Sequence, residues 1–167
     1  MANKGLAEGR RPKFHDFNMG GQLLLWASRH WMRAYRRGRT VLPCVWQSFA
    51  VSGIPEVYAE LCGLLNIVSF REFPARSFSR PNELKLSDSE IRFMMLFSEL
   101  EVNGDIRVES RISDIASPAV ARAIVARCER LLGELHQEGH RICHTQQSVD
   151  STHRLLHSEN PLAVNVH

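Results

Sequence analysis

The chain has 167 residues, of which 44% are hydrophobic and 23% are charged, and its formal net charge is +3. A chain of this length forms one domain whose core needs no disulfide or metal to hold it together. No apolar run approaches the roughly eighteen residues that cross a bilayer, and the basic amino terminus has no apolar signal-peptide core. These features exclude a membrane-spanning protein and predict a cytoplasmic one. The four cysteines form no CxxC pair, so we expect free thiols at Cys44, Cys62, Cys128 and Cys143.

Residues 1–16 are polar, glycine-bearing and basic, which predicts a disordered basic arm. From Met19 to about Arg37, apolar residues recur at steps of three and four, which predicts a helix. Its core-facing side is predicted to contain Leu23, Leu24, Ala27, Trp31, Ala34 and Tyr35. Gly38 follows as a left-handed stop.

Two further helices are predicted after this stop. One begins near Leu42 with Pro43 in its first turn and ends at Gly53. Its apolar residues are Val45, Trp46 and Phe49. Pro55 opens the next helix, in which a wide apolar stripe runs to Val68. The short connections predict antiparallel neighbours.

Residues 71–86 contain two prolines and three arginines, which predicts an extended connector. Ser87 and Glu90 then form a capping box that starts another helix. The segment 106–116 is ambiguous between a short strand and a helix. Ser117 and Pro118 begin a last strong helix, with the cap and the first-turn proline in the expected order, and this helix closes at Gly139.

The predicted fold is therefore all-α: a compact bundle of five to six helices over 17–139, preceded by the disordered arm and followed by a polar, histidine-rich tail over 140–167. Residues 22–70, roughly QLLLWASRHW…VWQSFAVSGIPEVYAELCGLLNIV, resemble short, uncharacterised helical proteins of alphaproteobacteria. The resemblance implies a bacterial, cytoplasmic origin and brings no function with it.

The stretch RHWMRAYRRGR, residues 29–39, concentrates positive charge at the end of the first helix. At about 100° per residue, Arg29, Arg33 and Arg36 share one stripe that faces away from the core side. Such a stripe is typical of an ordinary solvated helix end. With neighbouring apolar residues it also suits a protein partner or self-association. The candidate partner-binding residues are Leu25, Trp26, Arg29, Met32, Arg33, Arg36 and Arg37.

Nucleic acid is a third interpretation, because phosphates favour arginine and bases favour aromatic faces. Residues 87–136 also follow the order of helices found in helix-turn-helix modules, although ordinary bundle packing explains the same order. A DNA- or RNA-binding regulator would use Arg29, Arg33, Arg36, Arg122, Arg127 and Arg130.

The tail carries weak candidates for metal ligands, with two histidines spaced as zinc ligands on one helix face would be. The set is His140, Cys143, His144, His153 and His157. Its spacing matches no established zinc finger, so neither a metal nor any cofactor is expected. The sequence contains no phosphate-binding loop, GxSxG or HExxH motif. We therefore expect a non-catalytic interaction protein (a regulator, adaptor or assembly subunit), with the nucleic-acid-binding regulator as the alternative.

Overall fold

The computed structural model describes residues 11–69, 77–103, 112 and 116–142. Within these ranges the regular secondary structure is entirely helical, apart from one isolated β-bridge between Lys13 and Lys85. The elements are the 3₁₀-helix η1 (Phe14–Asp16) and the α-helices α1 (Met19–Arg36), α2 (Pro43–Val51), α3 (Pro55–Ser69), α4 (Asp88–Asn103) and α6 (Pro118–Gln137). The predicted all-α bundle is confirmed. Most of the ambiguous segment 106–116 lies outside the described residues.

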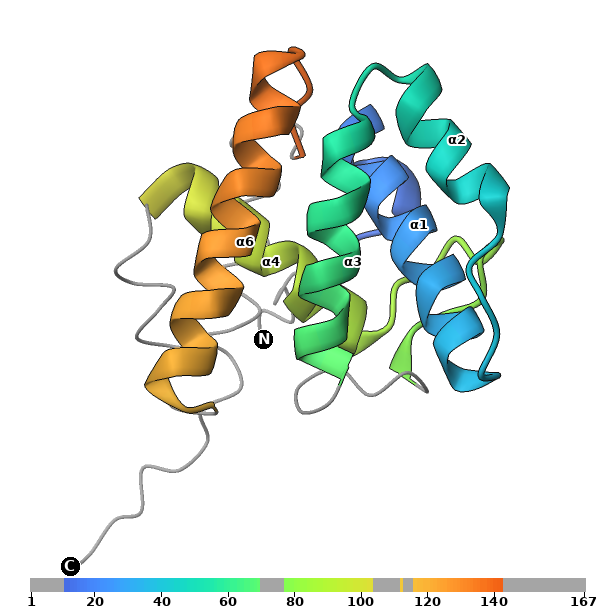
Figure 1. The fold of residues 1–167 in the computed structure, drawn as a ribbon, viewed down its shortest axis with the longest axis horizontal. Helices are drawn as coiled ribbons and strands as arrows, with labels where there is room; N and C mark the ends of the chain where they lie inside the picture. The colour runs from blue at the N-terminus through green and yellow to red at the C-terminus, as the bar shows by residue number, and fades with distance from the viewer. Residues whose placement is uncertain (1–10, 70–76, 104–111, 113–115, 143–167) are drawn as a thin grey trace, which may run out of the picture.

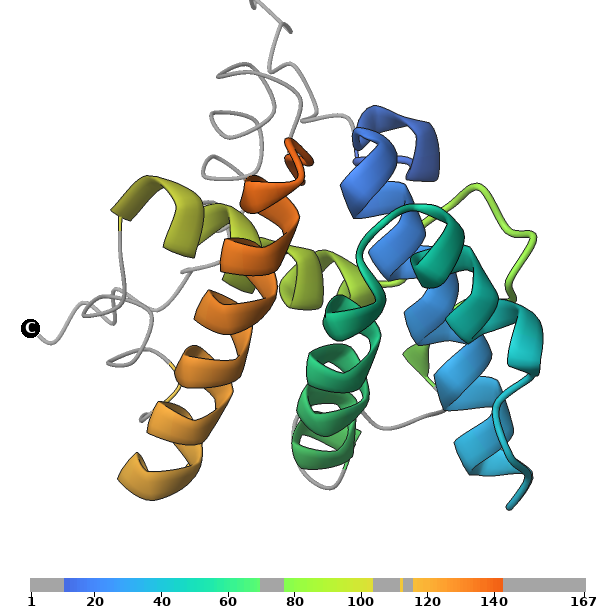
Figure 2. The ribbon, with the colours of Figure 1, turned by 45° about the horizontal axis from the view of Figure 1, so that its top comes forward.

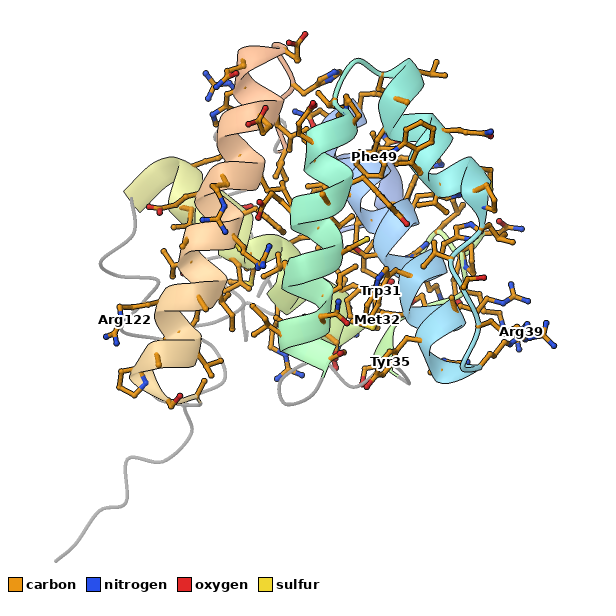
Figure 3. The ribbon with its side chains drawn as sticks, viewed as in Figure 1. Trp31, Met32, Tyr35, Arg39, Phe49 and Arg122 are labelled. Atoms are coloured by element: carbon orange, nitrogen blue, oxygen red, sulfur yellow. The ribbon has the colours of Figure 1, made fainter. Side chains whose placement is uncertain are left out.

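Helix α3 is central in the bundle. It has α6 on one side and α1 and α2 on the other, and α4 crosses behind α3 and α6 (Figure 1). The second view keeps α3 between α6 and α1 (Figure 2). Trp31 and Met32 of α1 point into the space beside α3, and Phe49 points from α2 toward α3 (Figure 3). The Phe49 and Tyr58 rings lie 5.7 Å apart and join α2 to α3. In the described part of the chain, no helix has the length and apolarity needed to cross a bilayer.

The helix ends follow local sequence signals. The Asn18 side chain caps α1 by accepting from the Gly21 N–H at 3.2 Å, and the Ser117 hydroxyl caps α6 by accepting from the Val120 N–H. Three glycines after helices have positive φ angles, which L side chains rarely adopt. They are Gly38 (59°), Gly53 (76°) and Gly139 (75°), so all three predicted stops are confirmed.

Ordered contacts extend on both sides of the predicted domain 17–139. Residues Phe14–Asp16 form η1, Lys13 bridges to Lys85, and Arg11 lies 3.1 Å from a carboxylate oxygen of Asp88. At the other end, Ile142 is fully buried. A Cβ on Gly21 would stand only 2.6 Å from the Ile142 carbonyl oxygen, so this glycine lets the chain after α6 pack directly on α1.

Two large aromatic residues are exposed, and one of them, Tyr35, is predicted to face the core. Trp46 is 50% exposed and Tyr35 is 41% exposed. In α2 the buried side chains are Val45 and Phe49, which are four residues apart. Trp46 follows Val45 and is turned about 100° away from it. Its side chain therefore lies off the buried face of α2 and is exposed to solvent. Tyr35 stacks on Trp31 at 5.3 Å and caps the core from outside.

Candidate anion-binding pocket

The arginines of residues 29–39 have two different environments. Arg29 is 1% exposed, although the helical wheel predicts that it faces solvent. Its guanidinium donates to both carboxylate oxygens of Glu90, from Nε at 2.6 Å and from Nη2 at 3.3 Å. Both side chains of this ion pair are completely buried. The expectation of a solvated Arg29 is wrong, because a carboxylate from 61 residues further along the chain lies on that side of α1.

The Arg29–Glu90 pair also fastens the loop before α4. Glu90 accepts from the Ser79 N–H at 3.1 Å, the Ser79 hydroxyl at 2.8 Å and the Ser87 N–H at 2.8 Å. Arg29 donates to the Lys85 carbonyl at 3.1 Å and to the Glu83 carbonyl. The bond from Ser87 completes the predicted capping box, in which the Glu90 N–H donates to Ser87 Oγ at 3.2 Å. One buried pair thus holds α1, the loop and the start of α4 together.

A cavity of about 680 Å³ opens between α1 and the loop residues 78–82. On one wall lie residues of α1 and its C-cap residue Arg37: Arg29, His30, Met32, Arg33, Arg36 and Arg37. Its loop wall consists of Phe78, Ser79, Arg80, Pro81 and Asn82. Among the described residues that line it, none is an aspartate or glutamate. We call this cavity the arginine pocket.

Four of the five lining arginines are exposed, namely Arg33, Arg36, Arg37 and Arg80. Within the described ranges, no carboxylate lies within salt-bridge distance of Arg33, Arg37 or Arg80. The charge of Arg29, in contrast, is balanced by Glu90. The pocket therefore carries an excess of positive charge, which attracts anions.

His30 lies in the pocket wall and reports this charge. Its ring is half-buried and lies 4.6 Å from the Trp26 ring. Burial lowers the pKa of His30 from its usual 6.5, and the positive charge of Arg33 lowers this pKa further. The imidazole is therefore neutral at pH 7 and adds a hydrogen-bonding group rather than a further charge.

The predicted partner-binding residues fall into two groups, those exposed in the pocket and those buried in the core. Arg33, Arg36 and Arg37 are exposed and come together in the pocket, as a binding surface requires. Leu25 and Met32 are 0% and 1% exposed, so the expectation that they lie on an exposed face is wrong. Trp26 is half-buried against the core and His30. The wheel underestimated burial because α1 packs on α3 and, on a second side, against the loop and α4.

The arginines predicted for nucleic-acid binding do not form one surface. Arg127 and Arg130 of α6 lie 3.0 and 3.2 Å from the carboxylate of Glu60 on α3. Gly63 makes room for this contact, because a Cβ there would collide with the Arg127 guanidinium. Arg122 points outward at the opposite edge of the molecule from Arg39, which follows α1 (Figure 3). Two of the three α6 arginines therefore serve helix packing.

The candidate metal ligands of the tail are mostly outside the described residues. His140 is described and half-buried, whereas Cys143, His144, His153 and His157 are not described. Among the side chains that are described, no three of the metal-binding types gather at one point. The three described cysteines, Cys44, Cys62 and Cys128, are free thiols.

Sequence reasoning missed the loop wall of the pocket. Arg80 belongs to a segment that the sequence predicts only as an extended connector, and His30 stands out only as part of the basic stretch. The capping box at Ser87 and Glu90 was the one signal near this wall, but it gives no hint of what the Glu90 carboxylate binds besides Ser87.

Comparison with known proteins returns no match among family models, curated proteins or solved structures. The resemblance of residues 22–70 to helical alphaproteobacterial proteins stays a prediction. The function proposed below rests on the arrangement of side chains in the arginine pocket.

Proposed function

We propose that the protein is a small non-catalytic interaction protein (a regulator, adaptor or assembly subunit) that binds an acidic protein partner through the arginine pocket. One observation carries this proposal: Arg33 and Arg37 at the C-terminal end of α1 and Arg80 of a distant loop are exposed and line a single cavity, and none of its described lining residues is acidic. Packing like charges together is unfavourable unless a ligand of opposite charge offsets it.

The chemistry of the pocket suits recognition. Arginine presents a planar fork of donors that pairs with carboxylate or phosphate in two parallel hydrogen bonds. It is also among the residues that contribute most to binding energy at interfaces. The loop wall is held by the buried Arg29–Glu90 pair before any partner arrives, so little conformational entropy is lost on binding.

Charge favours a different protein over a second copy of this chain. A symmetric dimer brings the same patch of both subunits together. Through this surface it would place Arg33 and Arg37 against their own equivalents. A separate acidic partner meets no such repulsion and is attracted from a distance.

The nucleic-acid alternative has less support. Arg127 and Arg130 are engaged with Glu60, and Arg122 lies far from the pocket side of the molecule (Figure 3). The remaining cationic surface is a small concave site, whereas a duplex binder typically neutralises about 6–10 phosphates along a groove.

Affinity capture from cells of the source organism tests the proposal. The full-length protein is compared with the double variant Arg33→Glu/Arg37→Glu and with the control Arg39→Glu, which changes an exposed arginine outside the pocket. We expect an acidic protein to be recovered in stoichiometric amount by the wild type and the control, and lost with the double variant. Equal recovery by all three proteins overturns the proposal. Loss of the captured protein on nuclease treatment also overturns it, because that result indicates binding through nucleic acid.

A further inference from the structure

We propose that the arginine pocket recognises a phosphate group with at least two negative charges, as a phosphate ester or pyrophosphate, in preference to a carboxylate. This inference deepens the function proposed above and rests on it, because it names the chemical group by which the ligand is held. A phosphorylated side chain of the partner and a free phosphorylated small molecule both supply that group.

The number and placement of the donors favour phosphate. A single guanidinium fork satisfies a planar carboxylate. Here Arg33 and Arg37 line the cavity from the C-terminal end of α1 and Arg80 lines it from the loop, so the donors come from two walls. A tetrahedral dianion has three terminal oxygens that accept from several directions at once and a charge that two or more guanidiniums balance. A single carboxylate leaves part of this positive charge unbalanced.

The opposed walls are fixed in advance. Ser79, the residue before Arg80, is bound by both its backbone N–H and its hydroxyl to Glu90, which is itself paired with Arg29. Arg80 therefore starts from an anchored backbone, and α1 supplies the rest from a rigid helix. A fixed cluster of donors around one point loses little freedom when the anion enters.

The size of the cavity indicates more than a bare ion. About 680 Å³ falls within the range of roughly 300–1,000 Å³ that is typical of small-molecule sites. One phosphate group would occupy a minor part of it. The remaining space admits the carrier of the phosphate, either the flanking residues of a peptide or a unit as large as a nucleoside.

Titration of His30 gives a readout that is independent of affinity. Arg33 lowers the pKa of His30 through its charge, so an anion that balances Arg33 raises this pKa. Nuclear magnetic resonance of the ring protons follows it directly. The substitution Arg33→Gln raises the His30 pKa without any ligand, because the repelling charge is gone.

The experiment is a calorimetric titration of the full-length protein at pH 7 and low salt. The two ligands are pyrophosphate and succinate, a dicarboxylate whose negative charge does not exceed that of pyrophosphate. We expect pyrophosphate to bind at least about tenfold more tightly and to raise the His30 pKa. The variants Arg33→Gln and Arg80→Gln each weaken pyrophosphate binding about tenfold or more, the factor that one charge-assisted hydrogen bond contributes. Arg39→Gln leaves it unchanged.

Two further ligands distinguish the sources of the phosphate. A phosphoserine peptide that binds more tightly than both pyrophosphate and the same peptide with glutamate indicates a phosphorylated partner. A nucleoside diphosphate that binds more tightly than pyrophosphate indicates a free small molecule.

The inference is overturned if pyrophosphate and succinate bind equally, if Arg39→Gln weakens binding as much as Arg33→Gln, or if none of these ligands binds. Its failure is separable from failure of the proposed function. If capture of the partner still depends on Arg33 and Arg37 while pyrophosphate shows no preference, only the phosphate inference fails. If pyrophosphate binds as expected while capture of the partner is unchanged in the Arg33→Glu/Arg37→Glu variant, only the protein-partner proposal fails.

Discussion

Replacing Arg29 by methionine tests whether this arginine holds the fold together. The change keeps a long side chain of apolar character but leaves the fully buried carboxylate of Glu90 without its cation. Removing one partner of a buried ion pair typically costs about 3–5 kcal/mol, because the other charge stays out of water. Ser79 and Ser87 still donate three hydrogen bonds to Glu90, so we expect the loss to lie near the lower end, at about 3 kcal/mol.

The measurement is urea unfolding at pH 7 followed by far-ultraviolet circular dichroism. The free energy of unfolding of an ordinary domain is about 5–15 kcal/mol. Arg29→Met therefore removes a large share of this free energy and clearly lowers the urea concentration at the midpoint of unfolding. The double variant Arg29→Met/Glu90→Gln no longer buries an unpaired charge and recovers part of the loss. With the single variant Glu90→Gln it completes a double-mutant cycle that measures the coupling between the two side chains.

Arg33→Gln is the matched control, since it changes an exposed arginine one turn further along the same helix. We expect a change within about 0.5 kcal/mol. If Arg29→Met is also within that margin of the wild type, Arg29 is not buried against Glu90, and the account of how the pocket loop is anchored fails.

Three other predictions follow from packing and burial. Gly21→Ala destabilises the fold by about 1–3 kcal/mol in urea unfolding, although alanine is normally the better helix former, because its Cβ would stand 2.6 Å from the Ile142 carbonyl oxygen. In the native protein a maleimide modifies Cys44, which is exposed, well before Cys128, whose burial raises its thiol pKa, as peptide mapping would show. Burial and Arg33 lower the pKa of His30, so the unfolded state binds more protons than the folded state between that pKa and about 6.5, and stability falls as the pH drops through this window. In His30→Gln that part of the pH dependence disappears.

The helices could be predicted from sequence because their signals are local. The glycine stop at Gly53, the Ser117 cap and the Ser87–Glu90 box each depend on residues within a few positions of one another. Periodicity likewise identified the buried face of α3, whose apolar stripe lies in the core.

The pocket could not be predicted because it depends on contacts between distant segments. A helical wheel gives the direction in which Arg29 points but not what lies there, and Glu90 follows it by 61 residues. The same holds for Arg80, whose position across from α1 is set by the bonds of Ser79 to Glu90. Spacing along the helix does not show which arginines are paired. Arg29 is buried and paired with Glu90, whereas Arg33 and Arg37 are exposed.

The central claim is that the exposed arginines of the pocket, and not positive charge in general, bind the partner. The most direct measurement is the equilibrium affinity of the captured partner, by calorimetry, for the wild type and for Arg33→Gln, Arg37→Gln, Arg80→Gln and Arg39→Gln. The account predicts that each of the three pocket changes weakens binding about tenfold or more, while Arg39→Gln has no effect, although it removes the same charge from the same end of α1. Equal weakening by all four variants, or by none, would contradict it.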